Sequence, residues 1–138
     1  MIVEKFKQLY QELDGSNIEI IESIYAPEIQ FHDPFHQVEG LQNLKEYFQD
    51  LYVGVDAISF DFGNSISDGN SHFVEWVMNL THPKLNKGQP FDVPGASLLK
   101  VNERQQIILH RDFFDAGVML YEQLPVLGSL VRLIKRRI

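Results

Sequence analysis

The stretch that decides the fold is Ile107-Ile108-Leu109-His110-Arg111-Asp112-Phe113-Phe114-Asp115. An apolar run that continues into alternating residues is typical of a β-strand, whose side chains point to two faces in turn. The alternation places His110, Asp112 and Phe114 on one face of this strand. A histidine and a carboxylate next to an aromatic ring are typical of a pocket lining, so this strand predicts both a sheet and a candidate site.

The chain before this strand divides into a helical first part and a strand-rich second part. Apolar residues at spacings of three and four predict helices over 3–13 and 41–51, with a further helix from Ile18 that Pro27 ends. Ile29 to Asp33 alternates and predicts a short strand.

From Ala57 onward, alternation predicts a series of strands. Two of them cover 72–82 and 91–101, and Pro94-Gly95 within the second indicates a bulge or a sheet edge. Helices followed by antiparallel strands are the α+β pattern, in which helices pack on one face of a sheet. We therefore expect three N-terminal helices on a strongly curved, mostly antiparallel sheet, which together form a cone around a deep apolar pocket.

The composition indicates one globular domain and excludes several classes of function. The 138 residues are 44% hydrophobic and include no cysteine, which excludes disulfides and thiol chemistry. The net charge of −7 argues against nucleic acid as a partner, because phosphate binding needs clustered cations. No signal peptide or membrane-length apolar run is evident, so a cytoplasmic location is expected.

The C-terminal segment 125–138 is set apart from the domain formed by 1–124. It carries four cations and no acidic residue, which leaves a charge of −11 on the rest of the chain. Its apolar residues predict an amphipathic basic helix, which could lie on a membrane surface or on a partner. The simpler expectation is that its cationic face packs on its own acidic domain or across a dimer.

Four short motifs together resemble the nuclear transport factor 2-like superfamily, in particular its SnoaL-like polyketide cyclases and ketosteroid isomerases. They are Ser23-Ile24-Tyr25-Ala26-Pro27-Glu28, Phe31-His32-Asp33-Pro34, Glu39-Gly40-Leu41 and Arg111-Asp112-Phe113-Phe114-Asp115, and the resemblance covers roughly residues 3–121. It implies a cone fold that is usually dimeric, so a homodimer is expected. Isomerases, cyclases, hydrolases and plain binding modules share this fold, so the fold alone does not give the function.

Two candidate residues follow from the ketosteroid isomerase resemblance. Asp33 matches the general base of that family, although an Asp before a proline can also simply cap the end of a strand. Tyr10 approximates the family's oxyanion donor, although it also fits the core stripe of the first helix. Ser97 falls where the isomerases place a protonated Asp as a second hydrogen-bond donor. Because a serine hydroxyl is a weaker donor than a carboxylic acid, this departure weakens the case for steroid isomerisation itself.

Asp112 matches an acid that cyclases and epoxide hydrolases use on this strand. With His110 it could act as a general base and its orienting partner; the alternative is a structural Asp bonded to Arg111 or to backbone. The Arg-x-Asp that epoxide hydrolases need is replaced by Trp76 and Met78, which argues against epoxide hydrolysis.

The remaining candidates concern the pocket and its contents. Six residues are expected to line a ligand pocket, although the bulky ones could equally be core filling: His32, Phe35, Trp76, Met78, Ser97 and Phe114. The histidine spacings match no metal-binding signature, so neither a metal nor another cofactor is expected.

Two functional hypotheses follow. The first is a cofactor-independent isomerase or cyclase that binds a small, mostly apolar carbonyl compound and uses a carboxylate base. The second is a non-catalytic ligand-binding or protein-association module of the same fold, which a cavity already filled by Trp76, Met78 and Phe114 would favour.

Overall fold

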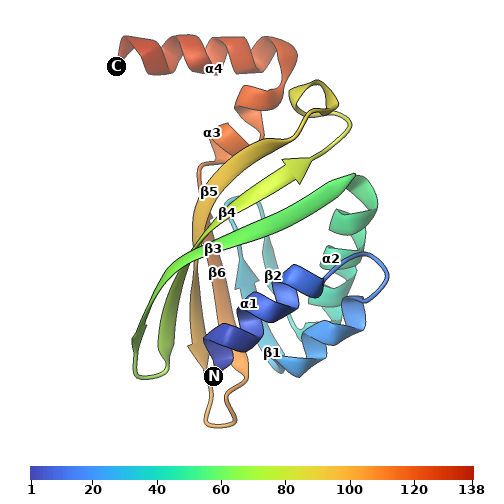
Figure 1. Ribbon diagram of the computed structural model, residues 1–138, viewed down its shortest axis with the longest axis vertical. Helices are drawn as coiled ribbons and strands as arrows, with labels where there is room; N and C mark the ends of the chain where they lie inside the picture. Colours follow the sequence, from blue (N-terminus) through green and yellow to red (C-terminus); the bar gives the residue numbers. More distant parts are fainter.

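The computed structural model describes residues 1–138 as helices on a curved six-stranded sheet (Figure 1). The elements in chain order are α1 (Ile2–Glu12), the 3₁₀ helix η1 (Ile18–Ser23), β1 (Tyr25–His32), β2 (Gln37–Glu39), α2 (Leu41–Gly54), β3 (Ala57–Asp68), β4 (Ser71–Thr81), the 3₁₀ helix η2 (Asn86–Gly88), β5 (Phe91–Val101), β6 (Ile107–Phe114), α3 (Ala116–Met119), the 3₁₀ helix η3 (Tyr121–Gln123) and α4 (Pro125–Arg137). None of the helices combines the length and the apolar character that crossing a bilayer requires.

The sheet has the strand order β2-β1-β6-β5-β4-β3. Every neighbouring pair is antiparallel except β1 and β6, which run parallel and place Phe31 beside His110. Long-range pairing of the first long strand with the last therefore brings the N-terminal third of the chain onto the strand that carries His110 and Asp112.

One side of the sheet is covered by α1 and α2, as Figure 1 shows. The larger apolar cluster lies beneath these helices and includes Phe6 of α1, Phe48 of α2 and Val74 of β4. A smaller cluster around Trp76 and Met78 of β4 lies toward the other end of the sheet. The expected α+β cone is confirmed, and the space between the two clusters is where a pocket can open.

The predicted second helix is wrong in both type and extent. Residues Ile18–Ser23 form a 3₁₀ helix, and the chain is already a strand at Tyr25, with Pro27 inside it. Ile18, Ile21 and Ile24 are spaced by three, which matches the 3₁₀ period as well as it approximates 3.6. Pro27 is tolerated because the β1–β6 register shifts between Tyr25 and Gln30, so the ladder has no paired position there.

Pro94-Gly95 marks a local edge rather than a bulge. The pairing of β4 with β5 continues without a shift through Val77–Pro94 and Trp76–Gly95. On the other side, the pairing of β5 with β6 begins at Gly95, opposite Phe114, so Pro94 lies just beyond the end of β6. Its missing N–H therefore costs no hydrogen bond to that strand.

Candidate functional site

An apolar cavity of about 560 Å³ is lined by side chains of α1, α2 and the sheet. This volume is within the usual range for small-molecule sites. Of its 23 lining residues, 18 are hydrophobic. The polar remainder comprises two carboxylates, two histidines and a lysine: Asp33, Asp112, His36, His82 and Lys84.

Asp112 is the carboxylate that β6 presents to this cavity. Its Oδ1 atom accepts a hydrogen bond from Ser97 Oγ at 2.5 Å and lies 2.6 Å from His110 Nε2. Its Oδ2 atom makes no hydrogen bond within the protein, and the side chain is 19% exposed. One oxygen is thus fixed by two partners while the other remains available to a molecule in the cavity. The alternative contact with Arg111 does not occur, because that guanidinium lies on the opposite face, over the ring of Phe113.

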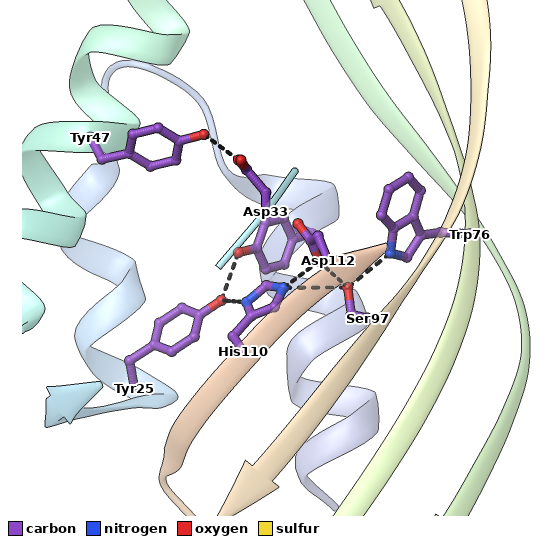
Figure 2. Close-up of polar contacts among 8 residues, drawn as sticks. Tyr25, Asp33, Tyr47, Trp76, Ser97, His110 and Asp112 are labelled. Carbon is purple, nitrogen blue, oxygen red and sulfur yellow. Dashed lines mark hydrogen bonds and ion pairs between the residues drawn. The ribbon is translucent and has the colours of Figure 1, made fainter. Parts of the chain in front are cut away.

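Behind Asp112, a chain of buried side chains leads back to the cavity at a second point (Figure 2). His110 is 1% exposed, and its Nδ1 lies 2.7 Å from the hydroxyl of Tyr25. The Tyr25 hydroxyl lies 2.6 Å from that of Tyr10, which lines the cavity. When Nε2–H of His110 donates to Asp112, the Tyr25 hydroxyl donates to Nδ1 and the Tyr10 hydroxyl donates to Tyr25. Every polar atom in this row of side chains then has a hydrogen-bond partner.

Burial keeps both tyrosines of this chain protonated. Removal from water raises the pKa of Tyr10 well above its usual value, and the neighbouring Tyr25 and Asp112 add to the effect. Desolvation likewise raises the pKa of Tyr25 well above its usual value. At neutral pH the two hydroxyls therefore serve as donors and acceptors of hydrogen bonds and not as bases.

Trp76 completes the support of Asp112 from β4. Its indole Nε1 donates to Ser97 Oγ at 2.9 Å, which leaves the serine hydroxyl proton directed at Asp112. The indole ring occupies the space above Gly95, where a Cβ would come within 2.3 Å of Trp76 Cη2. Glycine is therefore required at this position by the ring that lines the cavity.

Asp33 also lines the cavity, but both of its oxygens are occupied. Oδ1 accepts from the backbone N–H groups of Phe35 and His36, each at 2.8 Å, and Oδ2 accepts from the Tyr47 hydroxyl at 2.7 Å (Figure 2). These bonds cap the turn after β1, as an Asp before a proline commonly does. Neither oxygen of Asp33 is therefore free of a donor from the protein.

The predicted site residues fall into three groups. Seven line the cavity: Tyr10, Asp33, Phe35, Trp76, Met78, Asp112 and Phe114. His110 and Ser97 do not line it but are buried directly behind Asp112, so the predicted place of Ser97 in the lining is corrected.

His32 lies outside the cavity, and its predicted place in the pocket is likewise corrected. Alternation along β1 turns Phe31 inward, whereas the His32 ring contacts Gln37 Nε2 at 3.0 Å. Histidine and carboxylate side chains nowhere gather in a group of three or more that could hold a metal ion.

Two residues of the site, Tyr25 and Tyr47, are not anticipated from the sequence. The spacing of apolar residues places Tyr25 in a helical core stripe, and no motif singles out Tyr47. A buried tyrosine hydroxyl needs a polar partner, so Tyr25 among isoleucines is the available signal for a buried network.

Comparison with known proteins agrees with this architecture. The model of the SnoaL-like domain family matches residues 6–110. No curated protein sequence matches the chain.

Several solved structures share the fold at low sequence identity. A protein of Catenulispora acidiphila DSM 44928 with a ketosteroid isomerase-like fold, solved with trimethylamine, has a TM-score of 0.76 at 17% identity, covering 90% of this chain and 93% of that one. A Jannaschia sp. CCS1 protein classed with the SnoaL-like polyketide cyclases has a TM-score of 0.71 at 20% identity, covering 83% and 85%. At these identities the likeness establishes the fold alone.

Proposed function

The chain belongs to the SnoaL-like domain family, and from that premise we propose that it binds a small, mostly apolar carbonyl compound and moves a proton on it with Asp112 as the general base. No cofactor takes part in this proposal. The reaction would be of the isomerase or cyclase type, in which a proton leaves the carbon beside the carbonyl and returns elsewhere on the same molecule.

The free Oδ2 atom of Asp112 is the observation that carries this proposal. A general base must reach its proton within hydrogen-bond distance, which requires an oxygen that faces the cavity and has no competing donor. Asp112 meets this condition, whereas both oxygens of Asp33 accept hydrogen bonds from the protein. The geometry therefore favours Asp112 over Asp33 as the base.

The buried chain of hydrogen bonds links Asp112 to a donor at a second point of the cavity. The substrate proton binds the free Oδ2 atom of Asp112, while Oδ1 keeps its contacts with Ser97 Oγ and His110 Nε2. At the other end, the Tyr10 hydroxyl can turn from Tyr25 to donate to the oxygen of the substrate, where negative charge develops. The cavity thus offers a proton acceptor at Asp112 and a hydrogen-bond donor at Tyr10.

The cavity lining supports an apolar substrate. Most of its residues are aromatic or aliphatic, and Trp76, Met78 and Phe114 line it without filling it. The alternative of an association module with a filled cavity is therefore not supported. A non-catalytic ligand-binding module would use the same cavity and is separated from an enzyme by the following experiment.

We would test the proposal with phenylacetone, an apolar ketone with weakly acidic protons. Binding is followed by the fluorescence of Trp76, the sole tryptophan, and deuterium uptake from heavy water beside the carbonyl is followed by NMR. We expect wild-type protein to accelerate uptake, and Asp112→Asn to bind the ketone but lose about 100-fold or more of the rate. Fluorescence quenching without any acceleration would instead indicate a binding module.

A further inference from the structure

The C-terminal helix α4 presents its apolar side to solvent and not to its own domain. Its aliphatic side chains recur at spacings of three and four, so they share one side of the helix. Apart from Val131, which is half-buried, their exposed fractions range from 39% for Leu127 to 85% for Val126, and Leu130 and Ile134 are both more than half exposed. In Figure 1 the helix lies across one end of the molecule, apart from the sheet and from α1 and α2.

The opposite, polar side of α4 is the one that contacts the domain. Gly128 packs so closely on the backbone of Glu122 that a Cβ would come within 2.3 Å of its carbonyl oxygen. Arg132 donates to that same carbonyl at 2.5 Å, and Lys135 lies 3.0 Å from the Glu122 carboxylate. These contacts fix the orientation of the helix so that its apolar side faces outward.

We propose that this apolar side of α4 binds the surface of an anionic lipid bilayer. An amphipathic helix that lies in a membrane interface combines an exposed aliphatic side with flanking cations. Arg136 and Arg137 at the end of α4 are exposed, form no ion pair in the protein and can reach lipid headgroups. The segment 125–138 contains no acidic residue that would oppose this contact.

Charge favours a bilayer over a second copy of the chain as the occupant. Two α4 helices packed by their apolar sides would bring together Arg136 and Arg137 of both copies, with no acid on either helix to neutralise them. Outside α4 and the two terminal residues, the most exposed large hydrophobic side chains are Val53 of α2 and Ile66 of β3, which belong to separate elements. A bilayer covers the whole apolar side at once and supplies the negative charge that the cations need.

The position of α4 connects this surface with the cavity. Met119, Leu120 and Leu124, which lie just before the helix, are all cavity-lining residues. A helix held on a bilayer would thus keep this part of the lining close to the lipid phase, from which an apolar molecule could enter.

The test is sedimentation of the full chain with vesicles of phosphatidylglycerol mixed with phosphatidylcholine, compared with phosphatidylcholine alone. We expect binding to the anionic vesicles that salt weakens. The double variant Leu130→Glu/Ile134→Glu should abolish it, whereas the control Val53→Glu, which alters a still more exposed apolar residue of α2, should not. Arg136→Gln/Arg137→Gln should weaken it by about 25-fold, since each cation near an anionic surface contributes about fivefold.

Three results would overturn the proposal. The first is equal sedimentation of wild-type protein with anionic and neutral vesicles, and the second is full binding by Leu130→Glu/Ile134→Glu. The third is a dimer, measured by analytical ultracentrifugation, that this double variant dissociates while no vesicles are bound; it would assign the apolar side of α4 to a second copy. Unchanged circular dichroism of each variant ensures that loss of binding is not loss of the fold.

Discussion

Replacing Tyr25 by Phe removes one oxygen atom from the middle of the buried chain behind Asp112. The hydroxyl connects Tyr10 at 2.6 Å and His110 Nδ1 at 2.7 Å, and the side chain is 1% exposed. Each hydrogen bond contributes about 0.5–1.5 kcal/mol net, and a buried polar atom left without a partner costs about 1–3 kcal/mol. Tyr10 can turn its hydroxyl to the cavity, so only His110 Nδ1 loses its partner without replacement.

We therefore expect Tyr25→Phe to lower the free energy of unfolding by about 2–4 kcal/mol. The assay is urea denaturation followed by Trp76 fluorescence. Tyr52→Phe is the matched control: Tyr52 lines the same cavity, but its hydroxyl forms no hydrogen bond in the protein, so a change of about 0.5 kcal/mol or less is expected. Equal effects of the two variants would refute the reasoning that the buried chain is connected through Tyr25.

Three further predictions concern the cavity and its supports. Gly95→Ala should destabilise the protein by about 1–3 kcal/mol and shift Trp76 fluorescence, because the new methyl group overlaps the indole; an unshifted spectrum would contradict the packing. Raising the pH above about 10 should lower the free energy of unfolding by about 1.4 kcal/mol per pH unit for each of Tyr10 and Tyr25. The reason is that the pKa of both tyrosines is raised only in the folded state, so they ionise first in the unfolded chain. Urea midpoints that stay constant with pH would show that these tyrosines ionise equally in both states. Asp33→Ala should lower the free energy of unfolding by about 2–4 kcal/mol in the same denaturation assay, because the turn loses two backbone hydrogen bonds and the Tyr47 hydroxyl loses its acceptor. A negligible change would show that the turn is stable without the carboxylate.

The parts of the site that follow strand periodicity could be predicted from the sequence. His110, Asp112 and Phe114 share a face because side chains along a strand alternate, and Trp76 and Met78 line the cavity for the same reason. Their prediction needs only the local sequence, and in the structure each of them lies on the face that strand alternation predicts.

The parts that depend on long-range pairing could not be predicted. The parallel pairing of β1 with β6 sets Tyr25 opposite Ile107, and the Tyr25 hydroxyl reaches the side chain of His110. No local pattern specifies this contact between residues 85 positions apart. The same register turns Phe31, and not His32, toward the cavity. The spacing of three shared by Ile18 and Ile21 fits both helix types, so the sequence could not exclude a 3₁₀ helix there.

The competing roles of the two cavity carboxylates are also a matter of geometry. The family resemblance makes Asp33 and Asp112 both candidates for the base, whereas the number of hydrogen bonds at each oxygen distinguishes them. This distinction is central to the proposed function, because it assigns proton transfer to β6 and turn formation to the residue after β1.

The measurement that tests this assignment most directly compares deuterium uptake into phenylacetone for Asp112→Asn and Asp33→Asn. Both variants are measured at equal occupancy of the cavity, and the fluorescence of Trp76 reports that occupancy. We expect Asp112→Asn to lose about 100-fold or more of the wild-type rate and Asp33→Asn, if still folded by circular dichroism, to stay within about tenfold of it. A folded Asp33→Asn protein that loses the activity, while Asp112→Asn retains it, would contradict the assignment and make Asp33 the base.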